Sequence, residues 1–166
     1  GLTDTQDVTV TVTDVNEAPT ITSTTTAFSA AENQTAIPNA TFTASDVDAD
    51  DELTFSVSGD LLTIDANGVL SFLIEPDHET SSSITATVTV TDAAGLTDTQ
   101  DVTVTVTDVN EAPTITSTTT AFSAAENQTA IDEGTISAAD QDANDTLTFS
   151  VSVSYTHLRA HETKAN

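Results

Sequence analysis

The sequence predicts an all-β fold built from tandem seven-stranded Greek-key β-sandwiches that are truncated at both ends. Three observations predict it. Residues 1–37 recur identically as residues 95–131, an offset of 94. Threonine and valine alternate along several segments, and turns rich in Asp, Asn and Gly separate those segments. A fixed period of this length indicates one modest domain repeated in tandem, and alternation of apolar and polar residues indicates half-buried strands.

The strands follow from the alternation. Val8–Thr13 places valine on one face and threonine on the other, and both residues are β-branched and suit a pleated sheet. No segment has a sustained helical period, so almost no helix is expected. Seven strands are expected between Pro19 and Asn110, at Thr20–Ser29, Ala36–Ala44, Leu53–Val57, Leu62–Ile64, Val69–Ile74, Ile84–Thr91 and Thr99–Thr107. Seven short strands in about ninety residues are typical of a β-sandwich.

The repeat divides the chain into four parts. Residues 1–16 are expected to be the last strand and linker of an upstream repeat, and residues 17–110 a complete repeat. Residues 111–152 would then be the first three strands of a truncated downstream repeat. Residues 153–166 hold both basic residues, the single Tyr and two of the three His, and they lack the alternation. This tail resembles translated sequencing-adapter read-through, and a genuine basic terminus is the alternative, so no function is drawn from its histidines.

The charge restricts the function. The net charge is −25, from 27 acidic residues against two basic ones, Arg159 and Lys164. Such a surface repels nucleic acid and anionic lipid, and no apolar stretch is long enough to insert into a membrane. Intrinsic disorder is the competing interpretation of high charge with few aromatic residues, but the regular apolar pattern opposes it. Because cysteine is absent and internal cations are lacking, divalent metal from solution is the expected counterion.

Acidic residues recur at equivalent positions of the two repeats, near the expected strand ends. Ala31-Glu32-Asn33 returns as residues 125–127, and Asp46-Val47-Asp48 returns as Asp140-Gln141-Asp142. Asp77-His78-Glu79 and Asp92 follow later strands. The linker Asp108-Val109-Asn110-Glu111-Ala112-Pro113 is also present as residues 14–19. Carboxylates, amides and carbonyls are the oxygen ligands that a hard cation such as Ca²⁺ collects, six to eight at a time.

The order of these acidic motifs along the chain resembles that of a cadherin repeat. Residues 64–70 (Ile-Asp-Ala-Asn-Gly-Val-Leu) also resemble a hairpin of the same family. The resemblance covers residues 1–152 and is closer to the cadherin-like arrays of large bacterial surface adhesins, which share the Asn-Glu-Ala-Pro ending. It implies Ca²⁺ ions at each junction between repeats. The implied ligands of the inter-repeat joint are Glu32, Asp77, Glu79, Asp108, Asn110, Glu111, Asp140 and Asp142. Those of an upstream half-site are Asp14, Asn16, Glu17, Asp46, Asp48 and Asp92.

Two departures from the family pattern bear on this site. Glu111 stands where the animal family has Asp, and Ala112 follows where it has Asn. The alternative for any single position is a solvated acid at a strand end, which is an ordinary turn former. An EF-hand is excluded for the run that begins at Asp46, because its sixth position is Asp51 and its twelfth is Val57.

No enzyme is expected. Asp77 and Glu79 could imitate a glycosidase pair but share one loop, and His78 is the only histidine outside the tail, so no nucleophile has a partner base. The resemblance implies a Ca²⁺-binding segment of an adhesin outside the bacterial cell, serving adhesion or biofilm formation. Its partners would be neighbouring repeats of the same chain, with another cell-surface protein or a glycan as further candidates. The alternative is a metal-indifferent Ig-like spacer in a secreted surface protein.

Overall fold

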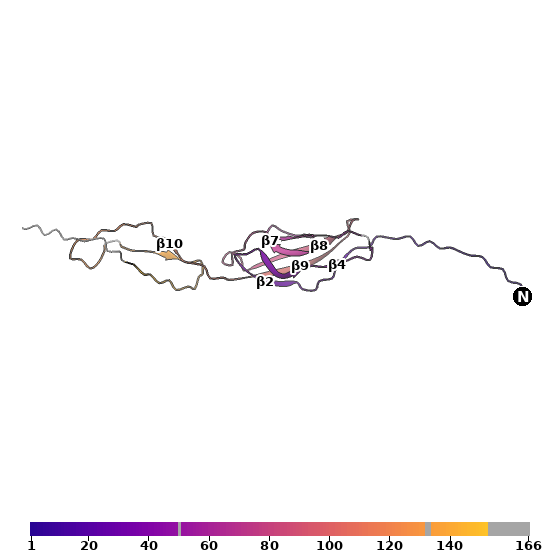
Figure 1. Cartoon of the computed structure of the whole chain (residues 1–166), viewed down its shortest axis with the longest axis horizontal. Helices are drawn as coiled ribbons and strands as arrows, with labels where there is room; N and C mark the ends of the chain where they lie inside the picture. Colours follow the sequence, from indigo (N-terminus) through magenta and orange to yellow (C-terminus); the bar gives the residue numbers. More distant parts are fainter. Residues whose placement is uncertain (50, 132–133, 153–166) are drawn as a thin grey trace, which may run out of the picture. The chain divides into compact units, whose positions relative to one another are not determined.

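The computed structural model describes residues 1–49, 51–131 and 134–152 and divides into two compact units, Gly1–Val109 and Asn110–Asn166 (Figure 1). None of the described segments forms a helix that is long and apolar enough to cross a membrane.

The first unit is a sandwich of two sheets. The four-stranded sheet has the order β2 (Ala27–Ala31), β9 (Thr97–Thr107), β8 (Ser83–Thr91) and β5 (Thr54–Val57). The three-stranded sheet has the order β3 (Ala36–Thr41), β7 (Val69–Phe72) and β6 (Leu62–Ile64). β2 runs parallel to β9, and the other pairs are antiparallel. A short pair, β1 (Thr20–Ile21) with β4 (Ala44–Ser45), completes the unit. The predicted all-β sandwich is confirmed.

Alternation along β8 and β9 builds one side of the core. Val102, Val104 and Val106 point inward and are at most 2% exposed, while the threonines between them face outward. In the parallel pairing of β2 with β9, Phe28 lies opposite Val104. The Phe28 ring meets the ring of Phe42 edge to face, with centroids 5.9 Å apart, so aromatic and aliphatic side chains of both sheets form one core.

Two predicted strands are each divided in the structure. The segment predicted as Thr20–Ser29 becomes β1 and β2, because β1 pairs with β4 while β2 pairs with β9 in the large sheet. The segment predicted as Ala36–Ala44 becomes β3 and β4. The register of β3 against β7 shifts between Ala36 and Thr41, where Pro38 lacks an N–H and Asn39 has a positive φ of 59°. The other five predicted strands form with bounds shifted by at most two residues.

A tight hairpin turn joins β6 to β7 and is hydrogen-bonded to the residue that follows β3 of the same sheet. Asp65 Oδ1 accepts hydrogen bonds from the backbone N–H groups of Asn67 (2.9 Å) and Val69 (2.8 Å). The bond from Val69, followed by those from Asn67, lowers the pKa of Asp65 although partial burial opposes the shift. Gly68 follows with a φ of +78°, and its carbonyl accepts the N–H of Phe42 at 2.8 Å.

The strand predicted at Val8–Thr13 does not form. Val8, Val10 and Val12 are 79%, 78% and 90% exposed, and residues 1–19 carry no strand (Figure 1). The identical residues Thr97–Thr107 form β9 because they lie between β2 and β8, whereas no described strand lies beside residues 3–13. A strand needs a hydrogen-bonding neighbour, so sequence pattern alone does not make one.

The second unit is also less regular than predicted. Its described part contains two short strands, β10 (Thr114–Ile115) and β11 (Ala138–Ala139), which pair antiparallel and are the counterparts of β1 and β4. Ala121–Ala125 and residues 148–151, the counterparts of β2 and β5, are not strands. In the first unit β2 and β5 are held by β9 and β8, and the described part of the second unit has no counterpart of either. Residues 153–166, the predicted non-native tail, lie outside the described residues.

Candidate metal centre

The predicted ligand residues of the first unit gather into two clusters at opposite ends of the sandwich. The proximal cluster consists of Asn16, Glu17, Asp46, Asp48 and Asp92, and the distal cluster consists of Glu32, Asp77, Glu79 and Asp108. Asp92 follows β8 before the turn into β9, and Asp108 follows the far end of β9. An eleven-residue strand is roughly 35 Å long, so the clusters are separate sites.

Hydrogen bonds fix the proximal cluster to the segment that precedes β1. Asn16 Nδ2 donates to Asp92 Oδ2 at 2.8 Å and to the Glu17 carbonyl at 2.9 Å. The Glu17 N–H donates to Asp48 Oδ2 at 3.0 Å, and the Asp48 N–H donates to Asp46 Oδ1 at 3.1 Å. The cluster is therefore built from three segments of the chain that are far apart in sequence.

The proximal cluster also includes Asp51, and two of its carboxylate oxygens are enclosed without a hydrogen-bond partner. One carboxylate oxygen each from Asp46, Asp51 and Asp92 lies within 4.8 Å of the others. Asp46 Oδ2 and Asp51 Oδ2 are shielded from solvent and accept no hydrogen bond. Buried acceptors are normally satisfied, so enclosed carboxylate oxygens facing like charges are arranged as cation ligands are.

The pKa values in this cluster reflect the same crowding. Burial raises the pKa of Asp51, and the nearby carboxylates of Asp92, Asp46, Asp48 and Asp14 add to the increase. The Asn16 amide lowers the pKa of Asp92, and backbone N–H groups of the following turn assist it against partial burial. Asp92 is only 5% exposed and stays ionised, so the site keeps negative charge without a cationic side chain beside it.

The distal cluster is organised by Glu32, which is 2% exposed at the end of β2. Glu32 Oε1 accepts the N–H of Val109, and Oε2 accepts the N–H of His78, each at 2.8 Å. It therefore ties the end of β9 to the loop after β7. One ligand oxygen each from Glu32, Asp77 and Glu79 lies within 4.8 Å of the others. Asp77 in turn caps its own loop, accepting bonds from Glu79 N at 3.1 Å and Thr80 Oγ1 at 2.8 Å.

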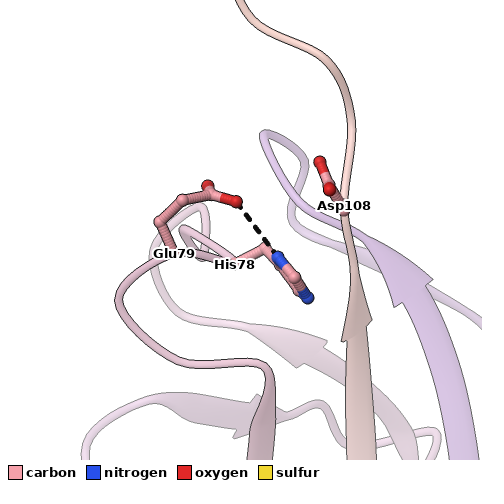
Figure 2. Close-up of side chains that lie close together, drawn as sticks. All are labelled: His78, Glu79 and Asp108. Atoms are coloured by element: carbon pink, nitrogen blue, oxygen red, sulfur yellow. Dashed lines mark hydrogen bonds and ion pairs between the residues drawn. The ribbon is translucent and has the colours of Figure 1, made fainter. Parts of the chain in front are cut away.

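His78 lies in this loop between two of the acidic residues. Its Nδ1 is 3.1 Å from Glu79 Oε1, and Figure 2 shows the pair beside the carboxylate of Asp108. The hydrogen bond to Glu79 raises the pKa of His78, burial opposes the increase, and the charges of Glu79, Asp108 and Glu32 support it. His78 is thus a local, titratable counter-charge for the distal carboxylates.

The second unit repeats the proximal cluster with the same hydrogen bonds. We call Asn110, Glu111, Asp140 and Asp142 the second proximal cluster. Asn110 Nδ2 donates to the Glu111 carbonyl at 2.8 Å, the Glu111 N–H donates to Asp142 Oδ2 at 2.8 Å, and the Asp142 N–H donates to Asp140 Oδ1 at 3.3 Å. Asp140 Oδ2 is enclosed and lacks a hydrogen bond, as Asp46 Oδ2 does in the first unit. The arrangement is a property of the repeat.

The residues present suit a hard divalent cation. The proximal clusters offer carboxylate, amide and backbone oxygens, with no imidazole or thiolate among the residues that form them. Such donor sets select Ca²⁺ or Mg²⁺ over softer metals. Residues 1–152 contain no Lys or Arg to neutralise the carboxylates.

Within each unit, the structure brings together the predicted residues of that unit. Asp14 lines the same surface hollow as Asn16 and Asp48. The sequence analysis did not identify Asp51, whose carboxylate lies with those of Asp46 and Asp92. It considered Asp51 only as the residue that breaks an EF-hand pattern. It also assigned no role to His78. The acidic run that continues past Asp48 was the available signal for Asp51.

Comparison with solved structures shows the fold. Human protocadherin-24 EC1-2 is 24% identical with a TM-score of 0.50, and the match covers 63% of this chain and 50% of that one. The protocadherin GammaB4 extracellular domain is 28% identical with a TM-score of 0.51, covering 64% and 20%. Drosophila N-cadherin EC1-4 is 22% identical with a TM-score of 0.50, covering 61% and 27%. The chain spans half or less of the length of these proteins.

These likenesses confirm the cadherin-like, Ig-like repeat that the sequence resembled. The comparison with curated proteins gave no match. A family model described as "Bacterial Ig domain" matches residues 16–105, which begin at Asn16 of the proximal cluster and end within β9. Because those residues are more than half of the 166-residue chain, the chain belongs to the bacterial Ig domain family.

Proposed function

We propose that this chain is a Ca²⁺-binding segment of a bacterial adhesin at the cell surface or outside the cell. The distal cluster of one repeat and the proximal cluster of the next would bind calcium together at each joint. Calcium supplies charge neutralisation there, and the residues that would hold it are Glu32, Asp77, Glu79, Asp108, Asn110, Glu111, Asp140 and Asp142. Neutralisation would rigidify the array for cell attachment or biofilm formation.

One observation carries the proposal. In both units the same three hydrogen bonds link the Asn side chain, the Glu backbone and the two Asp residues of the proximal cluster. In both units one Asp Oδ2 is also enclosed without a hydrogen-bond partner. Burying an unpaired carboxylate oxygen costs free energy. An acidic turn that bound no cation would therefore be expected to leave that oxygen exposed to water. In sequence, the second proximal cluster begins two residues after Asp108 of the distal cluster.

The proposed partners are the neighbouring repeats, with a surface protein or glycan on another cell as the adhesive target. The alternative function is a metal-indifferent spacer that only sets how far the protein extends. It is favoured by the apolar core, whose buried residues are all hydrophobic and include none of the proposed ligands. The two functions differ in whether the chain binds calcium and whether binding stiffens the joint between repeats.

We expect the chain to bind Ca²⁺ with a dissociation constant of roughly 10⁻⁴ to 10⁻³ M, as extracellular modules do. At a hundredfold excess over that constant, binding raises the free energy of unfolding by about 2.7 kcal/mol. Glu79→Ala should weaken this stabilisation, because Glu79 lies with Glu32 and Asp77. The measurement is the shift in melting temperature on adding calcium, supported by calorimetric titration.

Asp65→Ala is the matched control, since it removes one carboxylate from the same unit but from the β6–β7 turn. It should lower the melting temperature without calcium, because the turn loses the three hydrogen bonds that the Asp65 carboxylate accepts. Its calcium-dependent shift should equal that of the unaltered chain. Equal calcium responses of the two variants would contradict the assignment of the distal cluster, and the absence of binding heat in folded protein would favour the spacer.

A further inference from the structure

The outward face of the three-stranded sheet carries an apolar cross-strand pair. Leu62 of β6 lies opposite Phe72 of β7, and both are buried. The next pair in this register, Leu61 and Leu73, therefore points to solvent, because successive side chains alternate between the two faces. The Leu73 N–H donates to the Leu61 carbonyl at 2.9 Å, and the two residues are 56% and 43% exposed. Ile74 follows and is 63% exposed. We call Leu61, Leu73 and Ile74 the apolar patch.

The apolar patch departs from the residues that the repeat places on other outward positions. The outward positions of β8 and β9 hold Ser, Thr or Asp, as in the pair of Thr85 with Thr103. In the three-stranded sheet, the pair beside the patch is Thr63 with Ser71. A single exposed leucine is ordinary, but large apolar side chains that gather on one exposed face are typical of an interaction site.

The charges beside the patch restrict its partner. Asp60 precedes Leu61 and Glu75 follows Ile74, and both acidic residues are exposed. Residues 1–152 contain no Lys or Arg. A second copy that docked through the same patch would bring these carboxylates together, and an anionic lipid surface would be repelled. A basic polypeptide segment with apolar side chains fits both features, because it can cover the patch and place its cations near the carboxylates.

We propose that the apolar patch docks a cationic segment of a partner protein that also presents apolar side chains. Leu61 and Leu73 are the anchors, while Asp60 and Glu75 steer the approach of the segment. None of these residues is a proposed calcium ligand, so docking does not require calcium. The inference rests on the proposed adhesive role only for its setting, and it names the chemistry of the protein partner.

Three synthetic peptides of equal length test the chemistry of the partner. The probe alternates Lys with Leu, and the controls alternate Lys with Ser and Glu with Leu. Calorimetric titration of the full chain is carried out at about 0.15 M salt, where the Debye length is about 8 Å. The Lys–Leu peptide should bind more tightly than either control. Equal affinity for the Lys–Ser peptide would overturn the apolar anchors, and equal affinity for the Glu–Leu peptide would overturn the charge argument.

Leu61→Ser and Leu96→Ser test the location of the site. Both remove a leucine that is 43% exposed, but Leu96 lies in the turn between β8 and β9. Leu61→Ser should weaken binding of the Lys–Leu peptide about fivefold, because roughly half of a leucine side chain is lost from an apolar contact. Leu73→Ser should have a similar effect, whereas Leu96→Ser should leave the affinity unchanged. Equal affinities of Leu61→Ser and Leu96→Ser would refute the assignment of the patch.

Calcium and other occupants are separated by further measurements. The calcium-dependent melting shift of Leu61→Ser should equal that of the unaltered chain, so a failure of docking and a failure of calcium binding are different results. We expect light scattering to show no self-association through the patch, and vesicles of phosphatidylcholine not to bind it. Self-association or vesicle binding that Leu73→Ser abolishes would overturn the proposal in favour of a second copy or a bilayer.

Discussion

Gly68→Ala is expected to lower the free energy of unfolding of the first unit by about 2–4 kcal/mol. A Cβ at this position would lie 2.1 Å from the Phe42 carbonyl oxygen. That oxygen belongs to a residue that is 1% exposed in the core, so relief of the clash would displace Phe42. The left-handed φ adds roughly 1 kcal/mol for any residue with a side chain, and overpacking adds about 1–3 kcal/mol. Chemical denaturation of the full chain measures the change.

Gly59→Ala is the control because it separates the two costs. Gly59 has a similar φ of +82°, and a Cβ there would meet nothing within 4 Å. Its substitution should therefore carry only the conformational cost, about 1 kcal/mol. If both substitutions destabilised the protein equally, the close approach of the β6–β7 turn to Phe42 would be wrong.

Glu32→Ala is expected to destabilise the protein by about 2–4 kcal/mol even without calcium. The substitution removes the acceptor of two backbone N–H groups, those of Val109 and His78, which are 2.8 Å from the carboxylate. A buried donor left unsatisfied costs about 1–3 kcal/mol, and these two donors are only partly buried, so the expected sum stays at about 2–4 kcal/mol. The same variant should lose calcium-dependent stabilisation, because Glu32 is one of the three distal carboxylates that lie together.

Glu75→Ala provides the matched comparison. It removes the same charge from the loop after β7, but Glu75 is exposed. Its effect on unfolding should stay within about 0.5 kcal/mol, as is usual for surface positions. Denaturation of both variants with and without calcium gives all four values. Equal destabilisation would show that net charge, and not the two hydrogen bonds, accounts for the role of Glu32.

The sequence was sufficient to predict the sandwich because alternation and turn chemistry are local signals. Strand β6 was predicted with its observed bounds, and β8 and β9 within two residues. Local signals did not reveal where the chain changes partners, so the break between β1 and β2 was missed. Val8–Thr13 makes the same point, since the identical residues 102–107 are strand only where neighbours are available.

The candidate site was predictable in its residue types and less so in its geometry. Repetition of Asp46, Asp48 and Glu17 at an offset of 94 marked these positions before any contact was known. The enclosure of Asp46 Oδ2 and the approach of Asp51 depend on how the loop after β4 folds onto Asp92, which no spacing predicts. The sequence does not distinguish Glu32 from the other repeated acidic residues. Only the structure shows that its carboxylate accepts hydrogen bonds from two backbone N–H groups.

The most direct test uses two copies of residues 17–110 joined in tandem, which recreates a complete joint because residues 111–131 repeat residues 17–37. Small-angle scattering and far-ultraviolet circular dichroism would be recorded with and without millimolar calcium. We expect calcium to increase the maximum dimension or narrow its spread while the β-sheet signal stays nearly constant, because the core of the complete repeat consists of hydrophobic side chains and none of the proposed ligands. Unchanged scattering at saturating calcium would contradict a calcium-stiffened joint, and loss of β-sheet without calcium would contradict a metal that changes shape and not fold.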